Sequence, residues 1–304
     1  MAQPAHVKTR VAARAMATSE YADFFWESSE GLKLHARDYA GAADRPAILC
    51  LPGLTRNARD FEPVAEAFAG QWRVLALDFR GRGESDYAKE SDSYVPLTYV
   101  ADVLALVDEL KLDKVVAIGT SLGGIVTTLI ALQRPDLFAG VVLNDIGPVI
   151  ESEGLERIRD HVGHGRSFPT WMHAARALRD SSQAIYPDYA IEDWLALAKR
   201  LMCVGNNGRI AYDYDMKIAE PFSDPAAAEA VDLWPAFEAL GGRPGLVLRG
   251  ELSDLFSPVT FAAMGTRLAG FDCVTVPRVG HAPTLAEPEA QAAIARLLGR
   301  VLAA

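Results

Sequence analysis

The sequence predicts an α/β fold: a doubly wound, mostly parallel eight-stranded sheet with helices on both faces and a helical cap inserted after the sixth strand. Three observations lead to this prediction. Short aliphatic runs alternate with longer amphipathic segments, the pattern of strand–helix–strand units. The alternation stops after Pro148 and resumes near Leu233. Finally, a glycine-flanked serine, Ser121, lies between an apolar run and a segment of helical length.

Each predicted strand is a short apolar run bounded by turn residues. The first two flank a turn at residues 28–31 and are typical of an antiparallel hairpin. The remaining runs suit strands that are buried on both faces. The predicted strands are residues 24–26, 32–39, 47–51, 74–77, 115–118, 138–143, 246–249 and 273–276.

Helices are predicted between these strands, where apolar residues recur at helical spacing. In residues 100–110, for example, Val100, Val103 and Val107 fall on one face. Pro135 stops the helix that follows Ser121, because proline cannot continue a helix. The predicted helices of the sheet region are residues 60–69, 100–110, 122–133, 233–240, 258–268 and 288–302.

Residues 149–231 contain no buried strand candidate and are interrupted by glycine, proline and asparagine. We therefore divide the chain into a flexible leader at residues 1–20, an α/β core at 21–148 and 232–304, and a helical cap at 149–231. The cap holds large side chains that either line a substrate pocket or pack between helices. Those assigned to the pocket are Phe168, Trp171, Trp194 and Tyr214.

The composition narrows the class of partner. The formal net charge of -10 argues against nucleic acid and anionic membranes, which attract basic surfaces. The three cysteines are scattered and show no Cys-x-x-Cys spacing, so neither a zinc site nor a disulfide framework is expected. No apolar run approaches the roughly 20 residues of a membrane span. We expect a cytoplasmic protein with a small-molecule substrate, no cofactor or metal and no membrane insertion. A homodimer and a monomer are both compatible with the sequence.

Ser121 is the central residue of Gly-Thr-Ser-Leu-Gly at residues 119–123. A sharp strand-to-helix turn leaves little room for neighbouring side chains, and glycines two before and two after the serine relieve that crowding. The serine then lies at a helix N-terminus, which favours developing negative charge. The pattern predicts a nucleophile; the alternative is a serine that only caps the helix.

Other polar residues follow strands at the same edge of the sheet, where open α/β sheets bind their ligands. Asp254 follows the strand at 246–249, and His281 follows the strand at 273–276. The order serine, acid, histidine is that of a catalytic triad on this type of sheet. Asp145 follows the preceding strand and is the alternative acid; otherwise it caps a loop.

These motifs resemble those of the α/β-hydrolase superfamily, in its capped group of esterases, C–C hydrolases and lactonases, over about residues 20–302. The matching motifs are LPGLTRN at Leu51, DFRGRGESD at Asp78, GTSLGG at Gly119, RGELSD at Arg249 and GHAP at Gly280. The resemblance implies Ser121 as nucleophile, His281 as base, Asp254 as acid and the N–H groups of Leu54 and Leu122 as the oxyanion hole.

The resulting interpretation is a serine hydrolase that cleaves small to medium carboxylic esters through an acyl-enzyme. An alternative on the same triad is hydrolysis of a C–C bond in a diketone or ring opening of a lactone. An alternative of another class is a ligand-binding protein with idle catalytic machinery, since fold does not determine function.

Weaker signals are interpreted conservatively. Arg56 and Arg59 follow the oxyanion loop and are suited to a substrate carboxylate, although solvent exposure is the preferred interpretation. The charged loop at residues 78–85 is interpreted as a turn. His161, His164 and His173 lack a supporting carboxylate motif and are interpreted as solvated or packing residues rather than metal ligands.

Overall fold

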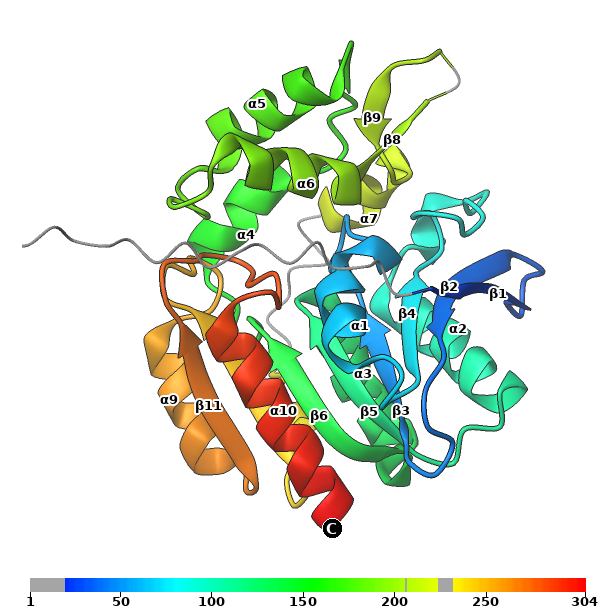
Figure 1. The fold of residues 1–304 in the computed structure, drawn as a ribbon, viewed down its shortest axis with the longest axis vertical. Coiled ribbons are helices and arrows are strands. Elements are labelled where there is room, and N and C mark those ends of the chain that lie inside the picture. Colours follow the sequence, from blue (N-terminus) through cyan, green and yellow to red (C-terminus); the bar gives the residue numbers. More distant parts are fainter. Residues whose placement is uncertain (1–19, 206, 224–231) are drawn as a thin grey trace, which may run out of the picture.

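The computed structural model of this 304-residue chain describes residues 20–205, 207–223 and 232–304, so the predicted leader at residues 1–20 lies almost wholly outside the described residues. An eight-stranded sheet forms the lower layer of Figure 1 in the order β1-β2-β4-β3-β5-β6-β10-β11. β2 is antiparallel to both β1 and β4, and the other neighbouring pairs are parallel. The predicted mostly parallel α/β sheet is confirmed. The strands are β1 (Ala22–Glu27), β2 (Lys33–Tyr39), β3 (Ala47–Leu51), β4 (Val74–Asp78), β5 (Val115–Thr120), β6 (Phe138–Asn144), β10 (Gly245–Gly250) and β11 (Phe271–Val276).

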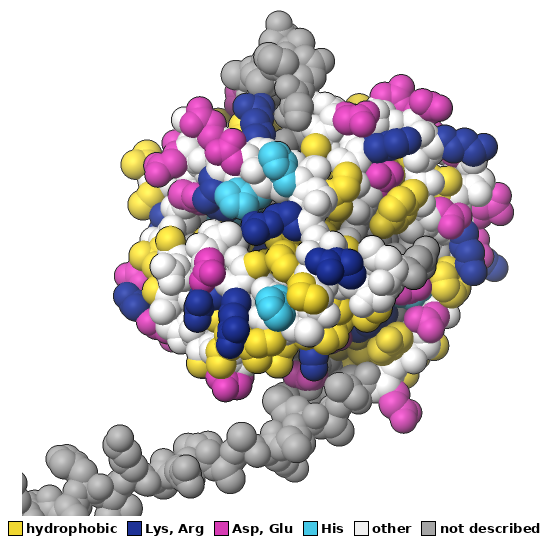
Figure 2. Space-filling view, turned by 90° about the horizontal axis from the view of Figure 1, so that it is seen from above, with side chains coloured by type: hydrophobic (Ala, Val, Ile, Leu, Met, Phe, Trp, Pro, Cys, Tyr) yellow, Lys and Arg dark blue, Asp and Glu magenta, His cyan; other side chains and the backbone are white. Residues whose placement is uncertain are grey.

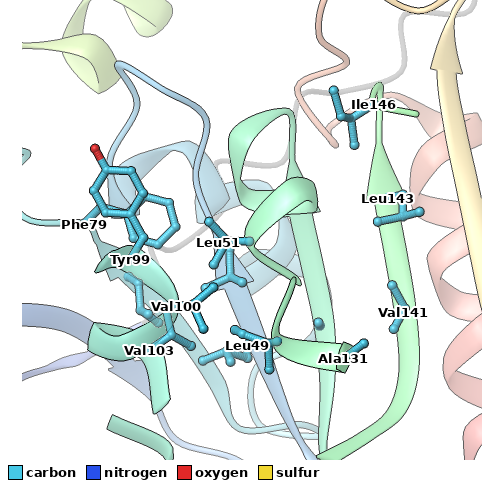
Figure 3. Packing of buried hydrophobic residues seen from close by; sticks show 14 of the residues in the cluster. Leu49, Leu51, Phe79, Tyr99, Val100, Val103, Ala131, Val141, Leu143 and Ile146 are labelled. Atoms are coloured by element: carbon cyan, nitrogen blue, oxygen red, sulfur yellow. The ribbon is translucent and has the colours of Figure 1, made fainter. Parts of the chain in front are cut away.

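Helices cover both faces of this sheet, because alternate side chains of each buried strand point to opposite faces. Leu49 and Leu51 of β3 belong to the core beneath α2, α3, α8 and α9, part of which is shown in Figure 3. Ile48 and Cys50 of the same strand belong to the core beneath α1 and α10. Each such buried aliphatic side chain contributes about 1.5–3 kcal/mol of hydrophobic stabilisation. The helices are α1 (Glu62–Phe68), α2 (Pro96–Glu109), α3 (Leu122–Gln133), α8 (Trp234–Glu238), α9 (Pro258–Arg267) and α10 (Pro288–Ala303), with short 3₁₀ turns η1 (Ala58–Phe61), η2 (Ser91–Ser93) and η3 (Pro135–Leu137).

The segment between β6 and α8 forms the upper layer of Figure 1, and we call it the cap. Its helices are α4 (Ser152–Arg159), α5 (Trp171–Ser182), α6 (Ile191–Leu201) and α7 (Ala219–Ser223), with the 3₁₀ turn η4 (Met216–Ile218). The cap also holds a three-stranded sheet in the order β7 (Ser167–Phe168), β9 (Ile210–Tyr212) and β8 (Met202–Val204). The segment predicted as a helical cap is thus mainly helical, and this small sheet was not predicted. Strands of two or three residues are too short to produce a recognisable alternation of apolar and polar side chains.

The charged loop after β4, interpreted as a simple turn, is a buried junction. The Asp78 carboxylate accepts hydrogen bonds from the N–H groups of Ala58, at 2.6 Å, and Glu84, at 3.1 Å. Its Oδ2 also lies 2.6 Å from Nδ1 of His35. A Cβ at Gly83 would overlap this carboxylate, and the backbone there has a positive φ of 53°. The loop therefore joins β2, β4 and the segment after β3.

Within the described residues, none of the helices combines the length and the apolar character needed to cross a bilayer.

Candidate active site

Ser121 occupies the sharp turn between β5 and α3. Its backbone has φ 52° and ψ −115°, a strained conformation for a residue with a side chain. A Cβ at Gly119 would overlap the backbone of Gly123, and a Cβ at Gly123 would overlap the carbonyl group of Leu51. Gly119 therefore lets the start of α3 approach β5 closely, and Gly123 lets it approach β3. The Ser121 hydroxyl makes no helix-capping hydrogen bond, in contrast to the alternative interpretation.

His281 lies between Ser121 and an aspartate. Its Nε2 is 2.9 Å from the Ser121 Oγ, and its Nδ1 is 2.7 Å from Oδ2 of Asp145. The His281 side chain is only 9 % exposed and that of Asp145 is fully buried. The three side chains thus form one continuous line of hydrogen bonds at the carboxyl ends of β5, β6 and β11.

Asp145 directly follows β6, and its carboxylate is held from three sides. Oδ1 accepts the N–H of Gly250 at 2.7 Å, and Oδ2 accepts the hydroxyl of Ser253 at 2.6 Å in addition to its contact with His281. A buried carboxylate needs such donors, because burial without them is costly. These contacts fix Asp145 in one orientation toward the imidazole.

Asp254, the predicted acid, does not contact His281. It forms a two-pronged ion pair with Arg157 of α4, with Nη2 2.7 Å from Oδ1. The loop after β10 is folded back on itself, because the Arg249 side chain donates to the carbonyl oxygens of Phe256 and Ser253. This loop places Asp254 away from the end of β10, whereas Asp145 directly follows the end of β6. The structure therefore places the alternative acid, and not the preferred one, beside the histidine.

Cap residues hold the loop that carries His281. The Gly280 N–H donates to the carbonyl oxygen of Ile185 at 2.7 Å, and the hydroxyl of Tyr186 donates to that of Ala282 at 2.8 Å. From the core, the Asn144 side chain donates to the Pro283 carbonyl oxygen at 2.9 Å. The position of His281 therefore depends on both layers of the molecule.

Two backbone N–H groups of residues that share a cavity with Ser121 have no acceptor among the described residues. Within the described residues, neither Leu54 nor Leu122 donates a backbone hydrogen bond. Leu122 is the first residue of α3, where helix geometry leaves N–H groups without partners. Leu54 lies in the loop after β3, and both residues line the same cavity as Ser121.

The cavity beside Ser121 has a volume of about 740 Å³ and is mostly apolar. Among its described lining residues, only Arg159 and Asp232 carry a charge. Tyr99 and Ile146, both labelled in Figure 3, belong to its wall. Other lining residues come from α3, α4 and α8 and include Ile125, Leu155, Ile158 and Trp234.

The predicted pocket residues of the cap lie elsewhere. None of the four lines the cavity that contains Ser121. Trp194 is buried against Tyr186 and Tyr189, and Phe168 and Trp171 belong to the same apolar cluster. Tyr214 is buried in the other core and accepts the N–H of Gly163 at 3.3 Å. These aromatic side chains therefore pack the cap, which was the alternative interpretation.

Arg56 and Arg59 are mostly covered rather than solvent-exposed. The side chain of Arg56 is 23 % exposed and pairs with Asp60 at 3.4 Å. The side chain of Arg59 is 17 % exposed, pairs with Asp213 of the cap and donates to the Arg200 carbonyl oxygen. The expected solvent exposure of these two side chains was therefore wrong. Neither residue lines the cavity that contains Ser121, so the cavity walls give no support to a substrate-binding role for Arg56.

The outer surface seen from the cap side carries histidine and basic side chains (Lys or Arg) among acidic and apolar ones (Figure 2). His161 Nδ1 contacts the Arg157 carbonyl oxygen at 2.8 Å, and His173 Nδ1 contacts the Thr170 hydroxyl at 2.9 Å. These contacts are local to their own helices. Within the described residues, no cluster of three potential metal ligands is present.

Sequence reasoning ranked the acid incorrectly and did not anticipate the cavity walls. One available signal for Asp145 was its position, immediately after the last residue of β6, whereas Asp254 lies four residues after β10. The position of Ile125 in the cavity wall could also have been predicted, because this residue lies four residues after Ser121 and therefore on the same side of α3. The contributions of α4 and α8 depend on how the cap folds over the sheet.

Comparisons with known proteins identify the family of this chain. Residues 48–294 match the model of the alpha/beta hydrolase family. A 3-hydroxybutyrate-oligomer hydrolase of Cupriavidus necator is 37% identical over 266 residues, which cover 85% of this chain and 89% of that protein. A 2-(acetamidomethylene)succinate hydrolase of Mesorhizobium japonicum is 27% identical, over 80% of this chain and 84% of its own length.

The crystal structure of an alpha/beta hydrolase from Novosphingobium aromaticivorans superimposes with a TM-score of 0.90 at 57% identity. The match covers 93% of this chain and 100% of that one. Fold, family match and relatives all agree: this chain belongs to the alpha/beta hydrolase family and is a hydrolase.

Proposed function

We propose that the protein is a serine hydrolase that cleaves small to medium carboxylic esters through an acyl-enzyme on Ser121. The observation that carries the proposal is the position of His281, whose two ring nitrogens contact the Ser121 hydroxyl and the Asp145 carboxylate. A serine hydroxyl is a poor nucleophile at neutral pH, and an adjacent imidazole that accepts its proton makes attack on a carbonyl carbon feasible.

The reaction divides into two steps. In the first, the Ser121 oxygen attacks the ester carbonyl, His281 takes the hydroxyl proton and then gives it to the departing alcohol. In the second, His281 takes a proton from water, the hydroxide attacks the acyl-enzyme, and the proton returns to Ser121. Asp145 holds the imidazole in the tautomer with hydrogen on Nδ1 and stabilises the imidazolium that forms in both steps.

Negative charge develops on the carbonyl oxygen in both steps. The N–H groups of Leu54 and Leu122 make no protein hydrogen bond among the described residues and are available to bind this oxygen. In related systems one such donor stabilises the transition state by roughly 3 kcal/mol. The α3 N-terminus adds a favourable dipole.

The cavity supports an acyl group that is apolar and of moderate size. Its walls are mainly aliphatic and aromatic, and its volume of about 740 Å³ is in the range of small-ligand sites. The Cupriavidus relative is named for a 3-hydroxybutyrate oligomer, an oligoester with one free carboxylate. We therefore include short hydroxyacid oligoesters among the proposed substrates, with Arg159 as the positive charge on the cavity wall.

A second candidate is hydrolysis of a C–C bond or a lactone by the same three side chains. The Mesorhizobium relative supports it, since its name describes a substrate that is not a simple carboxylic ester. Parallel assays with p-nitrophenyl butyrate, 3-hydroxybutyrate trimer, a γ-lactone and a ring-fission diketone separate the candidates. The highest kcat/KM on the first two is expected.

Mass spectrometry after reaction with a fluorophosphonate, and in single turnover with p-nitrophenyl butyrate, tests the acyl-enzyme directly. Wild type is expected to gain the probe mass at Ser121. Ser121→Ala is expected to gain none, and His281→Ala is expected to gain it much more slowly. Absence of any adduct on wild type would reject the serine-hydrolase proposal in favour of a binding protein on this fold.

A further inference from the structure

Arg82 is a buried cation with an unusual set of partners. Its side chain is fully buried, and no carboxylate of the described residues forms an ion pair with it. Arg80, two residues earlier and equally buried, pairs with Asp102 at 2.7 Å and also contacts Glu30. Burial of an arginine without a carboxylate is costly, so the contacts that replace it are informative.

Those contacts centre on the loop that carries the Leu54 N–H. Arg82 Nε and Nη2 both donate to the Leu54 carbonyl oxygen, at 2.9 and 2.8 Å. Nη1 donates to the Arg80 carbonyl oxygen at 2.7 Å and to the Tyr99 hydroxyl at 3.0 Å. The guanidinium also lies over the Tyr99 ring, 4.9 Å from its centroid. These contacts hold the guanidinium in one plane. Its two hydrogen bonds in turn hold the Leu54 carbonyl group in one orientation.

Leu54 lies outside any helix or strand. Its N–H and C=O belong to successive peptide groups that are linked only through its own φ and ψ. A carbonyl held by two donors of a rigid fork therefore restricts the direction of the N–H of the same residue. Because Leu54 and Ser121 line one cavity, this restriction acts where the carbonyl oxygen of a substrate becomes negative.

The loop that carries Arg82 is also bonded to the cap. Arg82 and Tyr214 form an isolated antiparallel bridge, and the Asp215 N–H donates to the Gly81 carbonyl oxygen at 2.8 Å. Tyr94, beside Arg82, donates its hydroxyl to the Asp215 carboxylate at 2.7 Å. Arg82 thus lies at the point where the cap, the loop after β4 and the loop after β3 meet.

We propose that Arg82 is a positioning residue for ester hydrolysis: its guanidinium holds the Leu54 carbonyl group and thereby restricts the φ and ψ of Leu54, so that the Leu54 N–H is directed at the developing oxyanion. The inference rests on the serine-hydrolase function proposed above. It predicts a specific loss of transition-state stabilisation rather than of substrate binding.

The test compares Arg82→Met, which removes the donors and keeps an apolar stem, with Arg82→Lys, which keeps the charge without the fork. Arg59→Met is the matched control, because Arg59 also joins the core to the cap and does not contact Leu54. Steady-state kinetics on p-nitrophenyl butyrate give kcat and KM. Inhibition by a butyl trifluoromethyl ketone, which forms an oxyanion on Ser121, is compared with inhibition by the matched methyl ketone.

For Arg82→Met we expect kcat to fall by about 10- to 100-fold with little change in KM, since removal of a whole oxyanion donor costs about 10²- to 10³-fold. Affinity for the trifluoromethyl ketone is expected to fall by a similar factor, and affinity for the methyl ketone to stay unchanged. Arg82→Lys is expected to fall between Arg82→Met and wild type. Arg59→Met is expected to retain wild-type kcat.

A folded Arg82→Met enzyme with wild-type kcat and ketone affinity would overturn the inference. So would an equal loss of affinity for both ketones, which indicates a general distortion of the site. If Arg82→Met does not fold, the same kinetic and inhibition measurements are made on Arg82→Lys and on Tyr99→Phe. The second variant removes one hydrogen-bond partner of the guanidinium. Failure of wild type to label with fluorophosphonate would instead reject the underlying function.

Discussion

Asp254 and Arg157 form an ion pair that joins the loop after β10 to helix α4 of the cap, with Arg157 Nη2 2.7 Å from Asp254 Oδ1. Burial disfavours the Asp254 carboxylate, but the hydrogen bond and charge of Arg157 outweigh this effect and lower its pKa. The ion pair therefore helps to hold helix α4 of the cap against the loop after β10. The carboxylate that contacts His281 is that of Asp145.

Replacement of the two aspartates separates these roles. Asp145→Asn is expected to lower kcat by roughly 10³- to 10⁴-fold on p-nitrophenyl butyrate, because an amide no longer holds the required imidazole tautomer. Asp254→Asn is expected to retain kcat within a few-fold and to lose less than about 1 kcal/mol of stability, since the pair is partly exposed. Steady-state kinetics and urea unfolding measure both. The opposite ranking of the two variants would restore Asp254 as the acid.

The close approach of α3 to β3 makes Gly123 intolerant of any side chain. In Gly123→Ala the new Cβ would overlap the Leu51 carbonyl group. We expect a loss of about 2–3 kcal/mol in the free energy of unfolding, as for overpacked cores, and loss of esterase activity. Gly299→Ala is the control, because a Cβ there meets no atom within 4 Å in α10. Better helix propensity should stabilise that variant by about 0.5–1 kcal/mol in urea unfolding; equal effects at the two sites would contradict the packing argument.

The buried His35 predicts a dependence of stability on pH. Burial opposes its protonation, but hydrogen bonds and charges from Asp78 and Asp23 outweigh burial and raise its pKa above the ordinary value of 6.5. A raised pKa in the folded state contributes stability that is complete below pH 6.5 and lost as pH rises through the folded value. The free energy of unfolding should therefore fall over this range in wild type.

Urea titrations at a series of pH values test this, with His35→Asn as the variant. The variant should lack the component of the slope that begins near pH 6.5. His161→Gln, at an exposed site, should retain it. A wild-type slope in His35→Asn would assign the pH dependence to another group.

Arg159 predicts a preference for substrates with a free carboxylate. It is the positively charged residue among the described lining of the cavity. For Arg159→Gln, kcat/KM on 3-hydroxybutyrate trimer is expected to fall about tenfold more than on the methyl ester of the same trimer, as for loss of a charged hydrogen bond. Arg157→Gln, on the same helix, should leave the ratio unchanged because Arg157 pairs with Asp254. An equal loss on acid and ester would show that Arg159 does not recognise the carboxylate.

Much of the sheet was predictable because its signals are local. The run at residues 47–51 is apolar throughout, and β3 has those same bounds. The turn at Ser121 was equally clear, since glycines at fixed distances from a serine reflect a steric requirement of the turn itself. The small sheet of the cap was missed because each of its strands is shorter than the run of about four to eight residues over which alternation reveals a strand.

The site could be predicted only in part, for a different reason. Asp145 and Asp254 both follow strands, and β6 and β10 are neighbours in the sheet, so chain order alone allows either carboxylate to meet His281. The decision comes from the loop after β10, which Arg249 folds back and Arg157 holds at the cap. In the same way, composition does not reveal that Arg82 is buried against Leu54 while Arg80 meets a carboxylate.

The sequence alone therefore determined the α/β sheet, the turn at Ser121 and the histidine after β11, because apolar runs and glycine spacing act over a few residues. The tertiary structure decided which acid faces His281, which side chains form the cavity and what the loop after β4 holds in place. Those outcomes depend on contacts between residues far apart in the chain, from Arg82 with Leu54, 28 positions apart, to His281 with Asp145, 136 positions apart, and no local pattern encodes them.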